Sequence, residues 1–562
     1  MKFNRKLLGQ QLKKWKGKSP LEMALALTGG LCVCGIILSI LLYTRYAFNS
    51  DLSYATNLAL EEMKQCRLYP DGWCYSTGFY VFSINLLSMP FLLFLKNEVL
   101  CRELAMVLLC VLMVLACYKV LYRYSKKMFW TVLALTFLPL TGVVHWYFYD
   151  GNYFSFAVMQ MLVLWLVKKA MFDENVKQRW IYYVLLVVAL IAFTNDGLRN
   201  QLTITIPLFA AAFFSFYRKK ENKIFEKKHA IFLGTVLLGA ALGYVFFGVV
   251  LHKVGITAWD SNYLMVNGVT LAQNVRPFFE NMYMLYGVKD TEMLSLTGIT
   301  NAVNAVYCTV SVFVVPVLVA VNMKKITHAW IRFVATFCIW CNILTTFMVI
   351  ATNAAATAAT GQRLLLPIYF NNILLCGCFV GFVAEHILRR YRELILIVVI
   401  AIACINQVNY QVQQRVDGKL NLSQGIFHTL FCPEDDSGIA QFLMEHDLTY
   451  GYAPFFHAYR TASFTNGNVR IVSFEGDPLQ KEAWMASEKW YDVEENSGRC
   501  FILVPQETEI DERYYELADE KLYYTANFKI TELAWLSGSI NYTILVYDKN
   551  IHLYPELTAE AN

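Results

Sequence analysis

Charged residues are scarce in this chain. Lys, Arg, Asp and Glu together make up 16% of its 562 residues, whereas an average soluble domain has about 25%. Hydrophobic residues account for 57%, and the mean hydropathy is +0.41. The sequence also lacks a Gly-x-x-x-x-Gly-Lys motif. These features exclude a disordered, collagen-like, coiled-coil or nucleic-acid-binding protein, and they disfavour an ATP-driven machine.

Charge is also unevenly distributed along the chain. Residues 1–409 contain 37 Lys and Arg against 19 Asp and Glu, whereas residues 410–562 contain 11 against 24. Parts of a chain with opposite net charge face different environments. The sequence therefore predicts a transmembrane domain at 1–409 with basic loops, followed by a separate, acidic, soluble α/β domain at 410–562.

Eleven apolar runs approach the length of about 20 residues that a helix needs to cross a membrane. They lie at 22–44, 104–122, 129–147, 153–168, 181–195, 202–217, 231–252, 303–322, 333–352, 364–385 and 393–409. The first run is an uncleaved anchor, because no small-residue cleavage site follows it. We therefore expect a polytopic α-helical membrane protein with about 11 transmembrane helices.

A twelfth apolar run, at 78–95, decides the orientation. If it does not cross, the basic N-terminus and five basic loops share one side, with 27 of the 37 Lys and Arg of the membrane domain. If it crosses, the loop RKKENKIFEKK at 218–228 lies opposite the N-terminus, against the positive-inside rule. We therefore expect 78–95 to lie along the outer surface or to re-enter, with Pro90 breaking its helix. The N-terminus is then on the cytoplasmic side of the plasma membrane.

This orientation places two long loops, 47–103 and 253–302, and the acidic domain outside. Alternating and β-branched residues between turn residues predict strands in that domain. A short helix is expected at 438–448, and strands are expected at 449–453, 469–474, 500–505, 528–536 and 541–548.

Two pairs of cysteines on the outer side are candidates for disulfides in this orientation. Cys66 and Cys74 lie in the first loop, and Cys432 and Cys500 lie in the acidic domain. Either pair could form a disulfide, and the sequence leaves this open because it gives no Cα distance.

The first outer loop opens with a helix signal. Asn49 or Ser50 can cap a helix, and Asp51 follows at its N-terminus. One stripe of this helix is formed by Leu52, Ala55, Ala59 and Met63. We expect an amphipathic helix at the membrane interface. Asp51 is either an acid favoured by the helix dipole or a functional carboxylate.

Other charged residues stand at the outer ends of later spans. Asp150, in HWYFYDGNYF, is costly so close to hydrocarbon unless it lines a cavity, although Asp-Gly also suits a turn. Asp196 and Arg199, in TNDGLRN, either pair with each other or form a plain turn. Arg363 is the only basic residue of its outer loop. Its guanidinium suits a phosphate or carboxylate, or it is an interfacial arginine.

Taken in order, these segments resemble the C-type glycosyltransferase (GT-C) superfamily, with the lipid A aminoarabinose transferases and the protein O-mannosyltransferases as the nearest likenesses. The likeness lies in an acid after the first span (Asp51), an Arg before the second (Arg102), an acid after the third (Asp150) and a late Arg-x-x-x-Pro segment, RLLLP (Arg363 and Pro367). It covers most of the membrane domain, and the subfamily stays open.

The resemblance implies an enzyme that moves a sugar from a polyprenyl-phosphate donor to an extracytoplasmic acceptor, with inversion at the anomeric carbon. The acceptor would be a cell-envelope glycan, a lipid or a protein. Asp51 would be the general base, and Asp150 would stabilise positive charge or orient the acceptor. Arg363, Arg199 and Arg102 would bind the donor phosphate. No cofactor is implied with certainty, and a divalent metal stays open because some members use one.

Two other classes of protein remain as alternatives to a glycosyltransferase. A transporter or flippase of lipid-linked sugars often has two matching halves with broken spans, and the sequence contains no such repeat. A non-catalytic membrane scaffold that presents the acidic domain would not need acids at its outer corners. A turnover assay with a labelled polyprenyl-phosphate sugar distinguishes the three classes.

Cysteine labelling tests the predicted orientation. A cysteine substituted at Glu221 should react with a membrane-impermeant maleimide only after permeabilisation, whereas one at Asp290 should react on intact cells. The unsubstituted protein gives the background from native cysteines. Labelling at position 221 on intact cells would show that the orientation is wrong.

Overall fold

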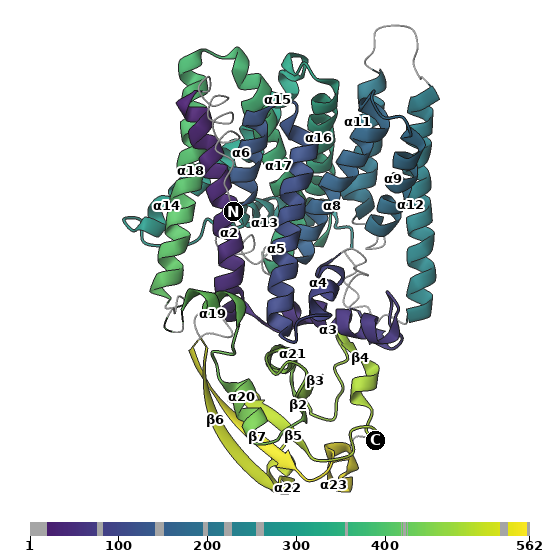
Figure 1. The fold of residues 1–562 in the computed structure, drawn as a ribbon, viewed down its shortest axis with the longest axis vertical. Helices are drawn as coiled ribbons and strands as arrows, with labels where there is room; N and C mark the ends of the chain where they lie inside the picture. The colour runs from purple at the N-terminus through teal and green to yellow at the C-terminus, as the bar shows by residue number, and fades with distance from the viewer. Residues whose placement is uncertain are drawn as a thin grey trace, which may run out of the picture.

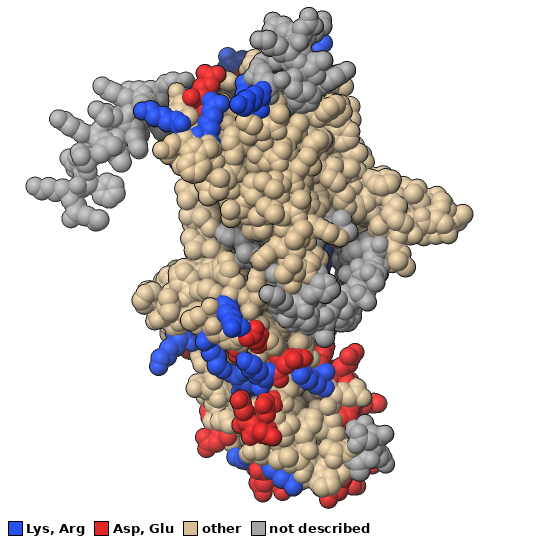
Figure 2. Space-filling model, turned by 90° about the vertical axis from the view of Figure 1, so that its right-hand side faces the viewer, with Lys and Arg blue, Asp and Glu red and all other residues tan. Residues whose placement is uncertain are grey.

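The computed structural model describes residues 19–75, 83–140, 151–194, 200–217, 227–254, 264–353, 358–417, 419, 423, 425–528 and 538–558. Long helices form a bundle, and a smaller mixed α/β domain lies at one end of it (Figure 1). Figure 2 shows charged side chains gathered at the two ends of the molecule, with a band almost free of them between. This distribution is expected for a helical domain that is surrounded by hydrocarbon.

Eight helices in the described part of the chain are long and apolar enough to cross a membrane. They are α2 (Pro20–Ala47), α5 with η1 (Glu98–Cys117, Tyr118–Tyr122), α8 with η2 (Asn152–Val167, Lys168–Phe172), α12 (Lys227–Val254), α14 with η4 and α15 (Leu296–Thr309, Val310–Val314, Val315–Val321), α16 (Ala329–Ile350), α17 with η7 and η8 (Ala358–Cys378, Phe379–Val383, Ala384–His386) and α18 (Arg389–Val416). The polytopic helical fold is confirmed.

Three of the eleven predicted spans correspond to shorter helices. They are α6 (Lys126–Thr136), α9 (Arg179–Thr194) and η3 with α11 (Gln201–Thr205, Ile206–Tyr217). The count of eleven crossings therefore stays a prediction. Outside the predicted spans, α13 (Gly268–Leu285) and η5 (Met323–Lys325) complete the membrane domain.

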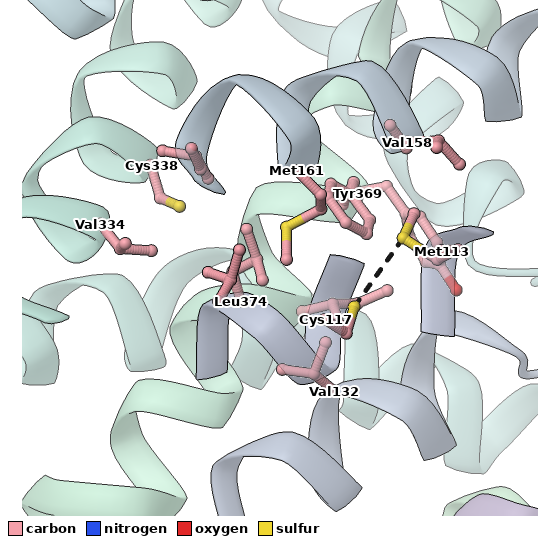
Figure 3. Packing of buried hydrophobic residues seen from close by; sticks show 14 of the residues in the cluster. Met113, Cys117, Val132, Val158, Met161, Val334, Cys338, Tyr369 and Leu374 are labelled. Carbon is pink, nitrogen blue, oxygen red and sulfur yellow. Dashed lines mark hydrogen bonds between the residues drawn. The ribbon is translucent and has the colours of Figure 1, made fainter. Parts of the chain in front are cut away.

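The centre of the bundle is packed with apolar side chains. Met113 and Cys117 of α5 belong to one buried cluster that also contains residues of α6, α8, α16 and α17 (Figure 3). Nearly all of the apolar stretch of α17 is buried. This helix therefore lies at the centre of the domain, and its side chains face other helices rather than lipid.

The run at 78–95 contains one described helix, α4 (Ile84–Leu92), and residues 76–82 lie outside the described residues. Nine residues of helix span about 14 Å, less than half of a hydrocarbon core of about 30 Å. Pro90 does not break this helix as expected, because it lies within α4 near its end.

The acidic domain contains a five-stranded sheet of order β3-β2-β5-β7-β6. Strand β2 (Tyr450–Pro454) pairs in parallel with β3 (Arg470–Phe474) and β5 (Cys500–Pro505), and β7 (Gly538–Tyr547) pairs antiparallel with β5 and β6 (Glu520–Phe528). The predicted strand at 528–536 lies almost entirely outside the described residues. The helices are α19 (Ile426–Phe431), α20 (Ile439–Glu445), α21 (Phe455–Phe464), η9 (Glu488–Tyr491), α22 (Glu512–Leu517), η11 (Ile551–Leu553) and α23 (Pro555–Thr558).

Helix α3 (Ser50–Gln65) lies between the bundle and the acidic domain (Figure 1). Most of its side chains are buried, from Ser50 to Ala59 and at Glu61 and Glu62, with Asp51 half-buried. The expected amphipathic helix is therefore present, but protein covers both of its sides rather than lipid and water. Helix α18 also continues to Val416, beyond the predicted boundary at 409.

The acidic domain is fixed to the bundle at several separate points. Arg45 Nη2, at the end of α2, donates to Thr429 O at 2.6 Å, and Asn97 Nδ2, before α5, donates to Pro433 O at 3.3 Å. The two-residue strand β1 (Trp73–Cys74) pairs with β4 (Ala486–Ser487). The first outer loop is therefore part of the domain interface.

All fifteen cysteines lie in the described residues, and the structure joins none of them in a disulfide. Cys500 is buried, and its thiol donates to Lys549 O at 3.5 Å. Neither of the two pairs considered from the sequence is therefore bonded in this structure.

Gly151 offers a test of the packing at the outer end of α8. Its φ is +73°, and a Cβ placed there would overlap the side chains of Met106 and Ile84. Backbone strain of about 1–2 kcal/mol and overpacking of about 1–3 kcal/mol should make Gly151→Ala clearly less stable in thermal unfolding. Gly30→Ala is the control, because no neighbouring atom lies within 4 Å of the added Cβ and alanine favours the helix. Equal melting temperatures for the two variants would contradict this packing.

Candidate functional site

Asp51 lies in the first turn of α3, directly after the chain leaves α2. Asn49 caps the helix, since its Oδ1 accepts a hydrogen bond from Leu52 N at 2.9 Å. This is the local signal that the sequence predicted. The cap fixes the start of α3, and therefore the position of Asp51, at the junction of the two domains.

Arg363 of α17 acts electrostatically on Asp51, although the two are far apart in the sequence. Burial raises the pKa of the Asp51 carboxyl above its ordinary value of 3.8, and the positive charge of Arg363 opposes that rise. Both side chains are half-buried. The structure thus brings together two of the predicted site residues. A carboxylate with a raised pKa is better suited to act as a general base near neutral pH.

Arg102 supports the backbone beside Asp51. It is fully buried, its Nε donates to Leu52 O at 2.9 Å, and its guanidinium lies 6.0 Å from the Phe48 ring. In this position its hydrogen bond stabilises the first turn of α3. The phosphate-binding role that the resemblance implies for Arg102 stays a prediction.

Asp150, Asp196 and Arg199 lie outside the described residues, so their assignments stay predictions. Described residues close to them in the chain line one pocket. Tyr153 follows Asp150 closely, and Phe193 and Asn200 flank the segment that contains Asp196 and Arg199. All three neighbours line the same pocket.

This pocket lies among α8, α9, η3 and α17, and the space between its walls is about 440 Å³, part of which is open solvent. Its lining is mainly apolar and aromatic: Tyr153, Phe156, Ala157, Gln160, Phe193, Asn200, Thr203, Ile204, Leu366, Pro367 and Phe370. Gln160 Nε2 donates to Asn371 Oδ1 at 2.7 Å, which satisfies that amide group within the protein. Such a cavity favours an apolar ligand that has a few polar atoms.

Arg363 stands above this pocket on α17. It shares a helix face with Pro367 and Phe370, because residues four and seven positions apart project in nearly the same direction. Helical side chains lean towards the N-terminus of their helix, so Arg363 reaches away from the pocket lining. The site therefore runs from an apolar pocket, through Arg363, to Asp51.

Sequence reasoning missed two further buried acids on α3, Glu61 and Glu62. Glu62 is 3% exposed, and both of its carboxylate oxygens lie 3.0 Å from Asn85 Nδ2 of α4. Burial raises its pKa to about 8, although the Asn85 hydrogen bond opposes the rise. Glu62 is eleven residues after Asp51, close to three helical turns. This spacing can be read from the sequence, and it places Asp51 and Glu62 on one face of α3.

No three His, Cys, Asp or Glu side chains gather to hold a metal ion within the described ranges.

Comparisons with known proteins give one likeness. No family model and no curated protein matches the chain. Among solved structures, the apo crystal structure of ArnT from Cupriavidus metallidurans is similar, with a TM-score of 0.47 and 10% sequence identity. The match covers 91% of this chain and 97% of that chain.

Glu62 should make stability depend on pH. Its folded pKa, about 8, is above its ordinary value of 4.5, so the folded protein binds more protons than the unfolded chain between those values. Its contribution to stability is present below about pH 4.5 and is lost as pH rises to 8. Glu62→Gln should therefore gain melting temperature relative to wild type over this range, as measured in thermal scans at pH 5 to 9.

Glu292→Gln is the matched control, because Glu292 is exposed in an outer loop. It should keep the same pH dependence as wild type. A constant difference between Glu62→Gln and wild type at every pH would show that Glu62 is ionised throughout.

Proposed function

We propose that this protein is a membrane glycosyltransferase of the GT-C type. It transfers a sugar from a polyprenyl-phosphate donor to a hydroxyl group of an acceptor on the outer side of the membrane. The observation that carries this proposal is the combination of an apolar pocket, an arginine on the same helix face, and a carboxylate under the influence of that arginine. These elements match the three parts of the reaction, namely lipid tail, phosphate and acceptor.

The proposed donor has an apolar part and an anionic part, and the site has a matching region for each. Its tail is apolar, and the aromatic side chains of Phe156, Phe193 and Phe370 give the pocket a matching apolar lining. Its phosphate is anionic and is suited to Arg363, whose planar guanidinium makes paired charge-assisted hydrogen bonds. A sugar on such a carrier is already activated. The protein therefore does not need a nucleotide-binding domain to supply energy.

The transfer step would then proceed by inversion. The bond between the anomeric carbon and the phosphate oxygen breaks, and its electron pair leaves with the phosphate, whose charge Arg363 stabilises. The acceptor oxygen attacks the opposite face of the anomeric carbon, and its proton passes to the Asp51 carboxylate. Positive charge develops on the sugar in the transition state. Asp150 is assigned to stabilise that charge or to orient the acceptor, and Arg199 to assist Arg363.

An acid that only favours the helix dipole and a general base predict different results for Asp51→Asn. Asparagine keeps the size of the side chain and is well tolerated at a helix start, so folding should survive. Since it cannot accept the proton, transfer should fall by about 10²–10⁴-fold. The measurement is turnover of a labelled polyprenyl-phosphate sugar, together with a thermal unfolding scan of each protein.

Asp71→Asn serves as the control, because Asp71 is an exposed acid of the same outer loop that pairs with Arg67. It should leave turnover unchanged. Near-normal transfer by Asp51→Asn would remove Asp51 as the base and transfer that role to Asp150. A wild-type protein that moves the intact lipid across the membrane without transfer would favour a flippase instead.

A further inference from the structure

Arg460 of α21 is an almost fully buried cation at the boundary between the two domains, with 4% of its side chain exposed. Its Nη2 lies 3.1 Å from Asp435 Oδ1, and Asp435 is equally buried. Its Nη1 donates to Ser437 Oγ at 3.3 Å. The guanidinium also lies within 5.0 Å of the rings of Phe464 and Phe528. The acidic domain therefore holds this side chain firmly from its own side.

The Nε–H group of Arg460 points out of the acidic domain and reaches the start of the catalytic helix α3. Its Nε donates to Phe48 O at 3.1 Å, just before α3 begins. Its backbone N–H donates to Ser50 Oγ at 3.4 Å, and Ser50 Oγ in turn donates to Phe455 O. Phe464 packs edge-on against Phe48, with ring centroids 5.4 Å apart. Four contacts thus bind α21 to the two residues that flank the cap of α3.

Asp51 follows Ser50 directly, and Arg102 holds the other side of the same turn through Leu52 O. The carbonyls of Phe48 and Leu52 are therefore gripped by arginines from different domains, one from α21 and one from α5. Between them, the backbone at Asp51 has little freedom to shift. A carboxylate fixed in this way keeps one distance from Arg363.

The ion pair of Arg460 and Asp435 is not needed merely to attach the acidic domain. Attachment is also provided by Arg45 to Thr429 O, Asn97 to Pro433 O and the pairing of β1 with β4. A buried ion pair is costly to desolvate and is weak evidence for a purely stabilising role. Its geometry here delivers one guanidinium N–H to a single carbonyl of the catalytic turn.

We infer that Arg460 is a positioning residue, through which the acidic domain sets the place of Asp51 relative to Arg363. The inference rests on the proposed function, since Asp51 is the proposed base. It gives the acidic domain a part in catalysis without any contact between that domain and the reacting atoms. Misplacing a reacting group by about 1 Å can cost about 10²-fold in rate, so a small shift of the turn is sufficient.

Two variants test the inference in the full-length protein. Arg460→Lys keeps a positive charge for Asp435, but it lacks the planar fork that reaches Phe48 O and Ser437 together. Ser50→Ala removes only the hydroxyl between Phe455 O and Arg460 N. Trp490→Phe is the matched control, because Trp490 Nε1 donates to Glu61 Oε1 at 3.0 Å across the same interface, at the far end of α3.

We expect both Arg460→Lys and Ser50→Ala to lower kcat by about 10- to 100-fold, with the donor KM changed by less than about twofold. Hydrogen exchange of peptides covering 48–58 should become faster in both. Trp490→Phe should match wild type in kcat and in exchange at 48–58. If Arg460→Lys does not fold, kcat and hydrogen exchange of Ser50→Ala alone test the inference.

Wild-type kcat in Ser50→Ala and in a folded Arg460→Lys would overturn the inference. An equal loss of kcat in Trp490→Phe would also overturn it, because the interface as a whole would then be responsible. If the wild-type protein has no transfer activity, the proposed function fails separately. Hydrogen exchange at 48–58 then tests only whether Arg460 and Ser50 hold the start of α3. Faster exchange in the variants supports this positioning role, and unchanged exchange overturns it.

Discussion

Two buried arginines from different domains grip one turn of backbone, and the arrangement of the site depends on this contact. Arg102 donates to Leu52 O and Arg460 to Phe48 O. Buried carbonyl groups need hydrogen-bond partners, and charged donors make stronger bonds than neutral ones. The first turn of α3 is therefore one of the points where the membrane bundle and the acidic domain are joined. Asp51 lies in the middle of it.

The position of this turn explains what each of the two domains contributes to the site. The bundle supplies a pocket whose aromatic lining suits hydrocarbon, and α17 carries Arg363 from that pocket towards α3. The acidic domain packs over α3, so the Asp51 carboxylate lies at the junction between the bundle and this domain. Burial at this junction raises the pKa of Asp51, and the nearby guanidinium limits the rise.

Local signals in the sequence predicted much of the fold. The apolar runs predicted the helical bundle, and Asn49 with its following apolar stripe predicted α3 and its cap. Strand β6 was missed because its side chains are mostly exposed and its sequence, EKLYYTANF, is rich in polar residues. Helix α21 was missed because no side chain caps it and its sequence, FFHAYRTASF, has aromatic residues on several faces.

The site was harder to predict than the fold, because its contacts join distant parts of the chain. Asp51 and Arg363 were each singled out from their place at the ends of spans, but their mutual influence depends on how α3 packs against the bundle. Nothing near Arg460 in the sequence indicates a bond to Phe48 O. Arg102 was assigned to phosphate binding by resemblance, which stays a prediction, and its bond to Leu52 O could not be inferred from the sequence.

The central claim is that the pocket beneath Arg363 holds the tail of a polyprenyl phosphate and that Arg363 holds its phosphate. An experimental structure of the protein in lipid nanodiscs with bound polyprenyl phosphate tests this most directly. The account predicts phosphate density within hydrogen-bonding distance of Arg363 and isoprene density against Phe156, Phe193 and Phe370. Phosphate density bound elsewhere, with the pocket empty of lipid, would contradict it.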